Sequence, residues 1–236
     1  MKAIYKRELH GFFLTGIGYV FIGVFITLAG MLFYINNLIT RSSDLSGFFN
    51  MVVYIWILLA PVLVMRLIAG DRKMGTDQLL LTAPVSISRI ITAKYLASLT
   101  ILAIALAISF VFPILIMIFG YVHLPEILTG YLGLFLCGGA YLAFDMLVSS
   151  FSHSPASAFI LAFGANLLLR MSGLLSAAFN LPSQLDISRF FDLDARYLPF
   201  VYGQMSFANI LFYVLFTAAS LFVSVQMMKI GRWTRA

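Results

Sequence analysis

The run YLASLTILAIALAISFVFPILIMIFGYVHLP, from Tyr95 to Pro125, contains no Asp, Glu, Lys or Arg. A helix needs about 20 mostly apolar residues to cross the hydrocarbon layer of a bilayer, where its backbone groups must bond to one another. The run is long enough to cross and to tilt or extend beyond the bilayer. Pro113 lies within it, and because proline lacks a backbone donor and crowds the preceding turn, we expect a kink there.

Five further runs without charged residues occupy most of the remaining chain, at 9–40, 45–65, 127–144, 146–169 and 197–228. The 236 residues are 62% hydrophobic and only 10% charged, which excludes an ordinary soluble fold. We therefore predict an all-α integral membrane protein with six transmembrane helices in a single domain, residues 1–236. The predicted spans are 15–37, 48–69, 88–119, 126–150, 155–178 and 206–228.

The basic residues predict the orientation of these spans. Eleven of the 15 lie before the first span, around the connection between the second and third, or after the last. Arg41, Arg170, Arg189 and Arg196 lie on or towards the other side. Because cytoplasmic loops carry the excess of Lys and Arg, both termini are predicted to be cytoplasmic. The basic residues flank apolar runs rather than forming a stripe on a polar surface, so we expect no nucleic-acid partner.

The N-terminal residues 1–14 mix charged and apolar side chains. Lys2, Lys6, Arg7 and Glu8 alternate with apolar residues such as Leu9. This pattern favours an interfacial amphipathic helix that lies under the lipid headgroups. The alternative is a solvated extension of the first span.

The connection between the second and third spans, residues 70–87, contains signals for a short helix between two breaks. Gly75 can end the preceding helix, and Thr76 is a good N-cap for a new one. Pro84 disfavours helix at the residue before it, so the element must stop there. The helix would expose Leu79, Leu80 and Leu81, which either dock onto a partner or dip into the lipid interface.

The stretch MRLIAGDRKMGTDQLLLTAPVSISRIITAKYLA, from Met65 to Ala97, resembles the signature region of ABC-2 type permeases, particularly the branch of gliding-motility-associated permeases. The match is specific at Met65-Arg66, Ile68-Ala69, Arg72, Gly75-Thr76 and Leu79 to Val85, and a looser similarity covers almost the whole chain. The resemblance implies a location in the bacterial cytoplasmic (inner) membrane. It also implies that a second permease copy, identical or merely similar, pairs with this chain, and that two ABC ATPase subunits and a periplasmic accessory protein are further partners.

In this family a cytoplasmic coupling helix docks into a groove of the ATPase. The resemblance assigns that role to Asp71, Arg72, Lys73, Met74, Gly75, Thr76, Asp77, Gln78, Leu79, Leu80, Leu81, Thr82 and Pro84. The sequence departs from the family pattern at Gly70-Asp71, which replaces an acidic pair, and at Gln78, which replaces an acidic residue. Both departures reduce the negative charge of the docking surface.

Nothing in the sequence predicts chemistry within the chain. It has no G-x-x-x-x-G-K-[ST] phosphate loop, so ATP and Mg are expected to bind in the partner ATPase. The three histidines are scattered, without a cluster at metal-ligand spacing. The serine-rich connection 149–157 has no discernible triad and reads as a polar cytoplasmic turn, with Ser152 and His153 as a second ATPase contact.

Two polar residues of the fifth predicted span are candidates for the translocation path. Arg170 carries a charge that is costly inside a bilayer, and Asn166 lies one turn earlier. The alternatives for Arg170 are snorkelling to the outer interface and a structural pair. Asp145, in the fourth predicted span, lies at a membrane depth too different from that of Arg170 for a direct pair. We expect it to be a hydrogen-bonded carboxylate at the membrane interface.

Two other features leave alternatives open. Gly133, Cys137, Gly139 and Ala143 permit close helix approach, either within one subunit or at a dimer seam. Residues 179–205 are more polar and suggest short helices on the outer face. The resemblance implies an outer gate or re-entrant element there, whereas the charge pattern alone equally fits a solvated loop.

The sequence thus predicts the permease subunit of an ABC-2 type exporter, which dimerises and couples ATP hydrolysis in separate subunits to outward transport. An alternative from another class is a membrane scaffold that anchors a protein complex without transport of its own. A third is an intramembrane enzyme acting on lipid, which the shortage of intramembrane ionisable residues disfavours. The sequence leaves the transported substrate open.

Overall fold

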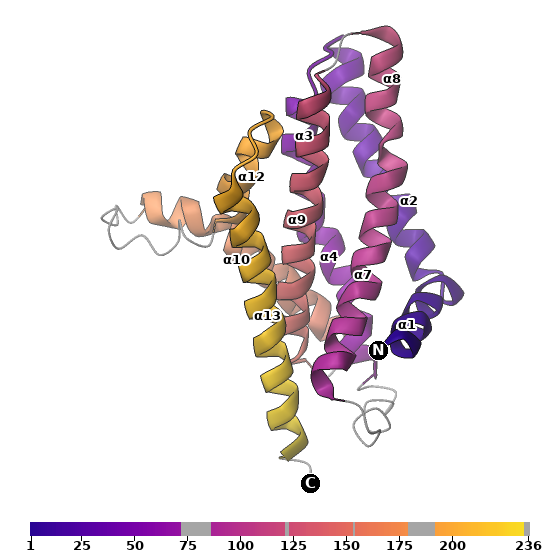
Figure 1. Ribbon diagram of the computed structural model, residues 1–236, viewed down its shortest axis with the longest axis vertical. Coiled ribbons are helices and arrows are strands. Elements are labelled where there is room, and N and C mark those ends of the chain that lie inside the picture. Colours follow the sequence, from indigo (N-terminus) through magenta and orange to yellow (C-terminus); the bar gives the residue numbers. More distant parts are fainter. Residues whose placement is uncertain (72–85, 121–122, 153, 179–191, 234–236) are drawn as a thin grey trace.

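The computed structural model describes residues 1–71, 86–120, 123–152, 154–178 and 192–233. Every regular element in these ranges is a helix, as expected (Figure 1). In chain order they are α1 (Lys2–Leu14), α2 (Ile17–Phe33), η1 (Tyr34–Ile39), α3 (Ser46–Val52), α4 (Ile55–Met65), η2 (Arg66–Gly70), α7 (Ile87–Ser109), α8 (Val111–Phe119), α9 (Leu124–Ser149), α10 (Pro155–Ala178), α12 (Leu193–Val201) and α13 (Phe207–Trp233).

Within the described ranges, five helical stretches are long and apolar enough to cross a membrane: Ile17–Ile39, Ser46–Gly70, Ile87–Ile118, Leu124–Ser149 and Phe207–Lys229. They correspond to five of the six predicted spans. The stretch Pro155–Met171 of α10 is a shorter apolar helix. The chain is therefore a multi-pass membrane protein, and its sixth span stays a prediction.

Helix α9 is the centre of the bundle. It packs against α4, α7, α10, α12 and α13. Its small residues make these contacts close, since a Cβ on Gly133 would lie 2.8 Å from Phe200 Cβ, and one on Gly138 would lie 2.7 Å from Leu102 Cδ1. Gly133, one of the small residues singled out in the sequence, therefore packs within the subunit, and a dimer seam at the others stays a prediction.

Helix α1 is a separate element and not an extension of α2. Gly16 adopts a left-handed conformation, with φ of +76°, which breaks the chain direction between the two helices. Helix α1 turns back beside the lower part of α7 (Figure 1), where the hydroxyls of Tyr5 and Thr100 are hydrogen-bonded at 2.9 Å. Lys2 and Lys6 are exposed while Phe12 is buried, and the predicted place of this helix at the membrane interface stays a prediction.

The expected break at Pro113 is present. Helix α7 ends at Ser109 and α8 begins at Val111. Because Pro113 has no backbone N–H, the carbonyl of Ser109 lacks its helical donor. The hydroxyl of Tyr131 on α9 donates to that carbonyl instead, at 2.8 Å.

Part of the predicted outer-face segment 179–205 forms a packed helix rather than a solvated loop. Asp192 caps the start of helix α12, and its Oδ1 accepts from the backbone N–H of Ala195 at 3.0 Å. Thr129 Oγ1 on α9 donates to the carbonyl of Phe200 at 2.8 Å, which holds α12 against the central helix. Residues 179–191 lie outside the described ranges, and the gate or re-entrant role stays a prediction.

Candidate functional site

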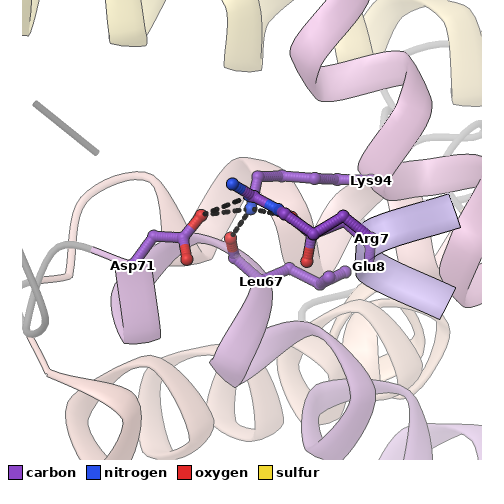
Figure 2. A network of polar contacts seen from close by, with 5 residues as sticks. All are labelled: Arg7, Glu8, Leu67, Asp71 and Lys94. Atoms are coloured by element: carbon purple, nitrogen blue, oxygen red, sulfur yellow. Dashed lines mark hydrogen bonds and ion pairs between the residues drawn. The ribbon is translucent and has the colours of Figure 1, made fainter. Parts of the chain in front are cut away.

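A buried lysine near the start of α7 joins three helices. The ammonium group of Lys94, on α7, donates to the carbonyl of Leu67 on η2 at 2.5 Å and to Glu8 Oε1 on α1 at 3.3 Å. It also donates to Asp71 Oδ2. Figure 2 shows these groups converging on the lysine, which is only 2% exposed. We call Arg7, Glu8, Leu67, Asp71 and Lys94 the Lys94 network.

The network balances its charges internally. Arg7 contacts Glu8 at 2.5 Å and Asp71 at 3.9 Å, so two cations face two carboxylates. Burial lowers the pKa of Arg7, but its hydrogen bond and attraction to Glu8, together with the charge of Asp71, outweigh this effect and raise it overall. A buried ion is stable only when its partners are kept, so removal of one member leaves the others uncompensated.

Local backbone geometry helps to present the Leu67 carbonyl. The turn Arg66–Gly70 is π-helical, and such widened turns shift backbone groups out of the ordinary helical hydrogen-bond register. Arg66 in the same turn donates from Nη1 to the carbonyl of Gly11 at 2.9 Å and to Thr15 Oγ1. Helix α1 is therefore attached to η2 at Gly11 and Thr15, and to α7 through Glu8.

The network contains the first of the predicted coupling residues. Asp71 is described and binds Lys94, whereas the other predicted coupling residues, within 72–84, lie outside the described ranges. Ser152, predicted as part of a second ATPase contact, is buried after the end of α9, and His153 is outside the described ranges. The coupling role of all these residues stays a prediction.

Arg170 makes a structural pair, one of the alternatives expected for it. Its guanidinium forms an ion pair with Asp194 on α12, donates to the Tyr54 hydroxyl at 2.5 Å and lies 4.1 Å from the centre of the Tyr54 ring. Burial raises the pKa of Asp194, and Arg170 partly opposes this effect. A role for Arg170 in the translocation path stays a prediction.

Asn166 and Asp145 both lie in the core. Asn166 is fully buried, and its Nδ2 donates to the carbonyl of Ile57 at 3.4 Å. Asp145 is also fully buried, and neither carboxylate oxygen has a hydrogen-bond partner in the structure. The expected hydrogen bonds of this carboxylate are therefore not observed, and its position relative to the membrane interface stays a prediction.

Sequence reasoning did not select Lys94 or Glu8 as site residues. Lys94 lies within the predicted span 88–119, and an ionisable side chain inside a span is expected to have a partner or a function. That signal was available from the sequence. The identity of its partners was not, since Glu8 is 86 residues away along the chain.

Within the described residues, no group of three or more His, Cys, Asp or Glu side chains is arranged to hold a metal ion. No curated protein matches the chain. Residues 58–185 match the family model described as ABC-2 family transporter protein, a range that includes Asp71, Lys94, Asp145 and Arg170. Because this match covers more than half of the sequence, the chain belongs to the ABC-2 family of transporter proteins.

Proposed function

We propose that this chain is the permease subunit of an ABC-2 type exporter. It couples ATP hydrolysis in separate ATPase subunits to the outward transport of a substrate. Membership of the family supports this function, since ABC-2 permeases are membrane transport components that normally work with ATPase partners. The observation that carries the coupling role is the burial of Lys94 between Asp71 and Glu8.

The Lys94 network lies where force from an ATPase would enter the bundle. Residues 72–85 connect Asp71 to α7, and Lys94 is about two helical turns beyond the start of α7. Asp71 and Lys94 therefore join the two chain ends that enter and leave this connection. A push on the connection would move η2 and α7 together, and Glu8 adds α1 to the same unit. If the connection were not attached by these ion pairs, it would move without displacing η2 and α7.

The assembly that we propose contains a second permease copy and two ABC ATPases, which bind ATP and Mg. Residues 71–82 and Pro84 would dock onto the ATPases, with Ser152 and His153 as a second contact. Helix α1, the start of α7 and the last turns of α13 lie at one end of the bundle (Figure 1), and the excess of basic residues there supports a cytoplasmic orientation. We further propose a bacterial inner-membrane location, kinship with the gliding-motility branch and a periplasmic accessory protein.

The test is affinity purification of the chain from its native membrane, followed by mass spectrometry and an ATPase assay in lipid nanodiscs. The variant Leu80→Asp puts a charge on the proposed docking surface. The matched control is Leu198→Asp, on an exposed position of α12 towards the other end of the bundle. We expect a P-loop ATPase to be recovered with the wild type and with the control, and to be lost with Leu80→Asp.

Two outcomes would contradict the proposal. Recovery of no P-loop ATPase with the wild-type chain would remove the energy source and refute the coupling role. Recovery of an ATPase together with no ATP-dependent substrate movement in liposomes would favour the scaffold function instead.

A further inference from the structure

Three polar side chains of α9 and α10 are buried, and each has at least one oxygen atom without a hydrogen-bond partner. Asp145 and Ser149 lie four residues apart on α9, and therefore on the same face of that helix. The amide of Asn166 on α10 interacts with the carboxyl of Asp145. All three side chains are 0% exposed. We call Asp145, Ser149 and Asn166 the α9–α10 polar site.

Four oxygen atoms of this site lack a hydrogen-bond partner: both carboxylate oxygens of Asp145, the hydroxyl of Ser149 and Oδ1 of Asn166. Buried polar atoms without partners are rare in folded proteins. Three of the four, on Asp145 and Asn166, can only accept when Asp145 is ionised. The site then has a surplus of acceptors and a shortage of donors.

No charged side chain of the described residues compensates an ionised Asp145. None of the ion pairs among the described residues includes Asp145. Helix α9 packs against η2, α4, α7, α10, α12 and α13. The ionisable side chains described on these helices are Arg66, Arg89, Lys94, Tyr95, Arg170, Asp194, Arg196, Tyr197, Tyr213 and Lys229.

The cations nearest to the core are already engaged elsewhere. Lys94 binds Asp71 and Glu8, Arg66 binds the carbonyl of Gly11, and Arg170 binds Asp194. An isolated carboxylate away from water is so unfavourable that such a group ordinarily becomes neutral. A metal cation is a poor candidate for the neutralising charge, because hard cations such as calcium take about six to eight oxygen ligands and this site offers four.

We propose that Asp145 is a proton-binding site within the α9–α10 seam. The proton taken up from water resides on one carboxyl oxygen, and the resulting acid hydroxyl donates to Asn166 Oδ1. One proton thus removes the buried charge of Asp145, provides a donor for Asn166 Oδ1 and joins α9 to α10. This assignment concerns the resting bundle and does not depend on the proposed exporter function.

The Asn166 side chain extends the link to a third helix. Its Nδ2 donates to the carbonyl of Ile57 on α4, while its Oδ1 is left to accept from Asp145. A separation of α9 from α10 would expose Asp145 to water and allow the proton to leave. The charged carboxylate would then oppose renewed packing of α9 against α10. Protonation of Asp145 therefore stabilises the closed bundle.

The test is infrared spectroscopy of the purified protein in nanodiscs at pH 7, with aspartate labelled by ¹³C at the side-chain carboxyl. A protonated carboxyl gives a carbonyl stretching band distinct from the bands of a carboxylate. We expect this acid band in the wild type, shifted by the label, and its complete loss in Asp145→Asn. The matched control is Asp194→Asn, which should keep the band because Asp194 is paired with Arg170.

Absence of a label-sensitive acid band in the wild type would overturn the proposal, and so would its persistence in Asp145→Asn. A stability measurement gives a second readout. Because the asparagine amide resembles the neutral acid in shape and charge, the melting temperature of Asp145→Asn should stay within about 4 °C of the wild type. A much larger fall would mean that the wild-type side chain is ionised and paired, and would also overturn the proposal.

Discussion

Asn166 on α10 donates a hydrogen bond to the carbonyl of Ile57, which is the backbone acceptor on α4 that Pro61 leaves without its helical donor. A proline removes the N–H that would bond to the carbonyl four residues earlier, and a carbonyl in a membrane-embedded bundle cannot turn to water. The side chain of a neighbouring helix therefore completes α4. The buried position of Asn166 thus has a structural explanation in addition to the proton site proposed above.

This relationship predicts coupling between Asn166 and Pro61. Asn166→Leu should destabilise the protein by about 1–3 kcal/mol, because a buried acceptor loses its donor. In a Pro61→Ala background, where the backbone can bond to Ile57 again, the same substitution should cost about 1 kcal/mol less. A double-mutant cycle on thermal or detergent denaturation measures the difference. Equal costs in the two backgrounds would show that Asn166 does not act through Ile57.

The same reasoning applies to Tyr131 and Pro113. Tyr131→Phe removes the hydroxyl that donates to the carbonyl of Ser109, and should lower the free energy of unfolding by about 1–3 kcal/mol. Pro113→Ala restores the helical donor and should reduce that loss. The matched control is Tyr202→Phe, at an exposed tyrosine, which should have little effect. If the two Tyr→Phe variants unfold at the same temperature, the proposed bond contributes nothing.

Lys94 should be essential for the stability of its network. Lys94→Met leaves Asp71 and Glu8 without their shared cation, and should destabilise the protein by about 3–5 kcal/mol, the cost typical of breaking a buried ion pair. Lys229→Met, at an exposed lysine of α13, is the matched control. Thermal unfolding in detergent compares the two.

Neutralising the partners should rescue the Lys94 variant. The triple variant Lys94→Met, Asp71→Asn and Glu8→Gln removes the uncompensated charges, and should recover most of the lost stability. It should not recover coupling to an ATPase, since the ion pairs that join η2, α1 and α7 are gone. A triple variant as unstable as Lys94→Met alone would argue that lost packing, rather than charge, causes the defect.

Two glycines provide a matched test of close packing around α9. A Cβ on Gly138 would lie 2.7 Å from Leu102 Cδ1 and 3.2 Å from Trp56 Cε2, whereas a Cβ on Gly164 would have no neighbour within 4 Å. Gly138→Ala should therefore cost about 1–3 kcal/mol through overpacking. Gly164→Ala should be neutral or slightly stabilising, because alanine is the better helix former. Similar effects of the two substitutions in thermal unfolding would contradict the packing described here.

Local features of the sequence predicted the elements well. Charge-free runs predict spans because each charged residue inside a bilayer carries its own cost, whatever the rest of the chain does. The break at Pro113 was predictable for the same reason, since a missing N–H acts within one helical turn. The separation of α1 from α2 was left open, because Gly16 only permits the left-handed conformation that it adopts.

Contacts between distant residues were not predictable in this way. Arg170 and Asp194 are 24 residues apart, and Lys94 and Glu8 are 86 apart. A single sequence shows that such ionisable groups need partners but not which partners they meet. The full burial of Asp145 was unpredictable for the same reason, since it depends on the packing of other helices against α9 and not on its own neighbours in the chain.

The sequence by itself determined that the chain is a helical membrane protein, where its apolar runs lie and which family its connection at 65–97 resembles, because these depend on composition and short-range pattern. Only the tertiary structure decided that α9 is the central helix, that Lys94 joins α1, η2 and α7, and that Asp145 is left buried beside Asn166. Helix packing creates these contacts, and it depends on the shapes of all the helices together.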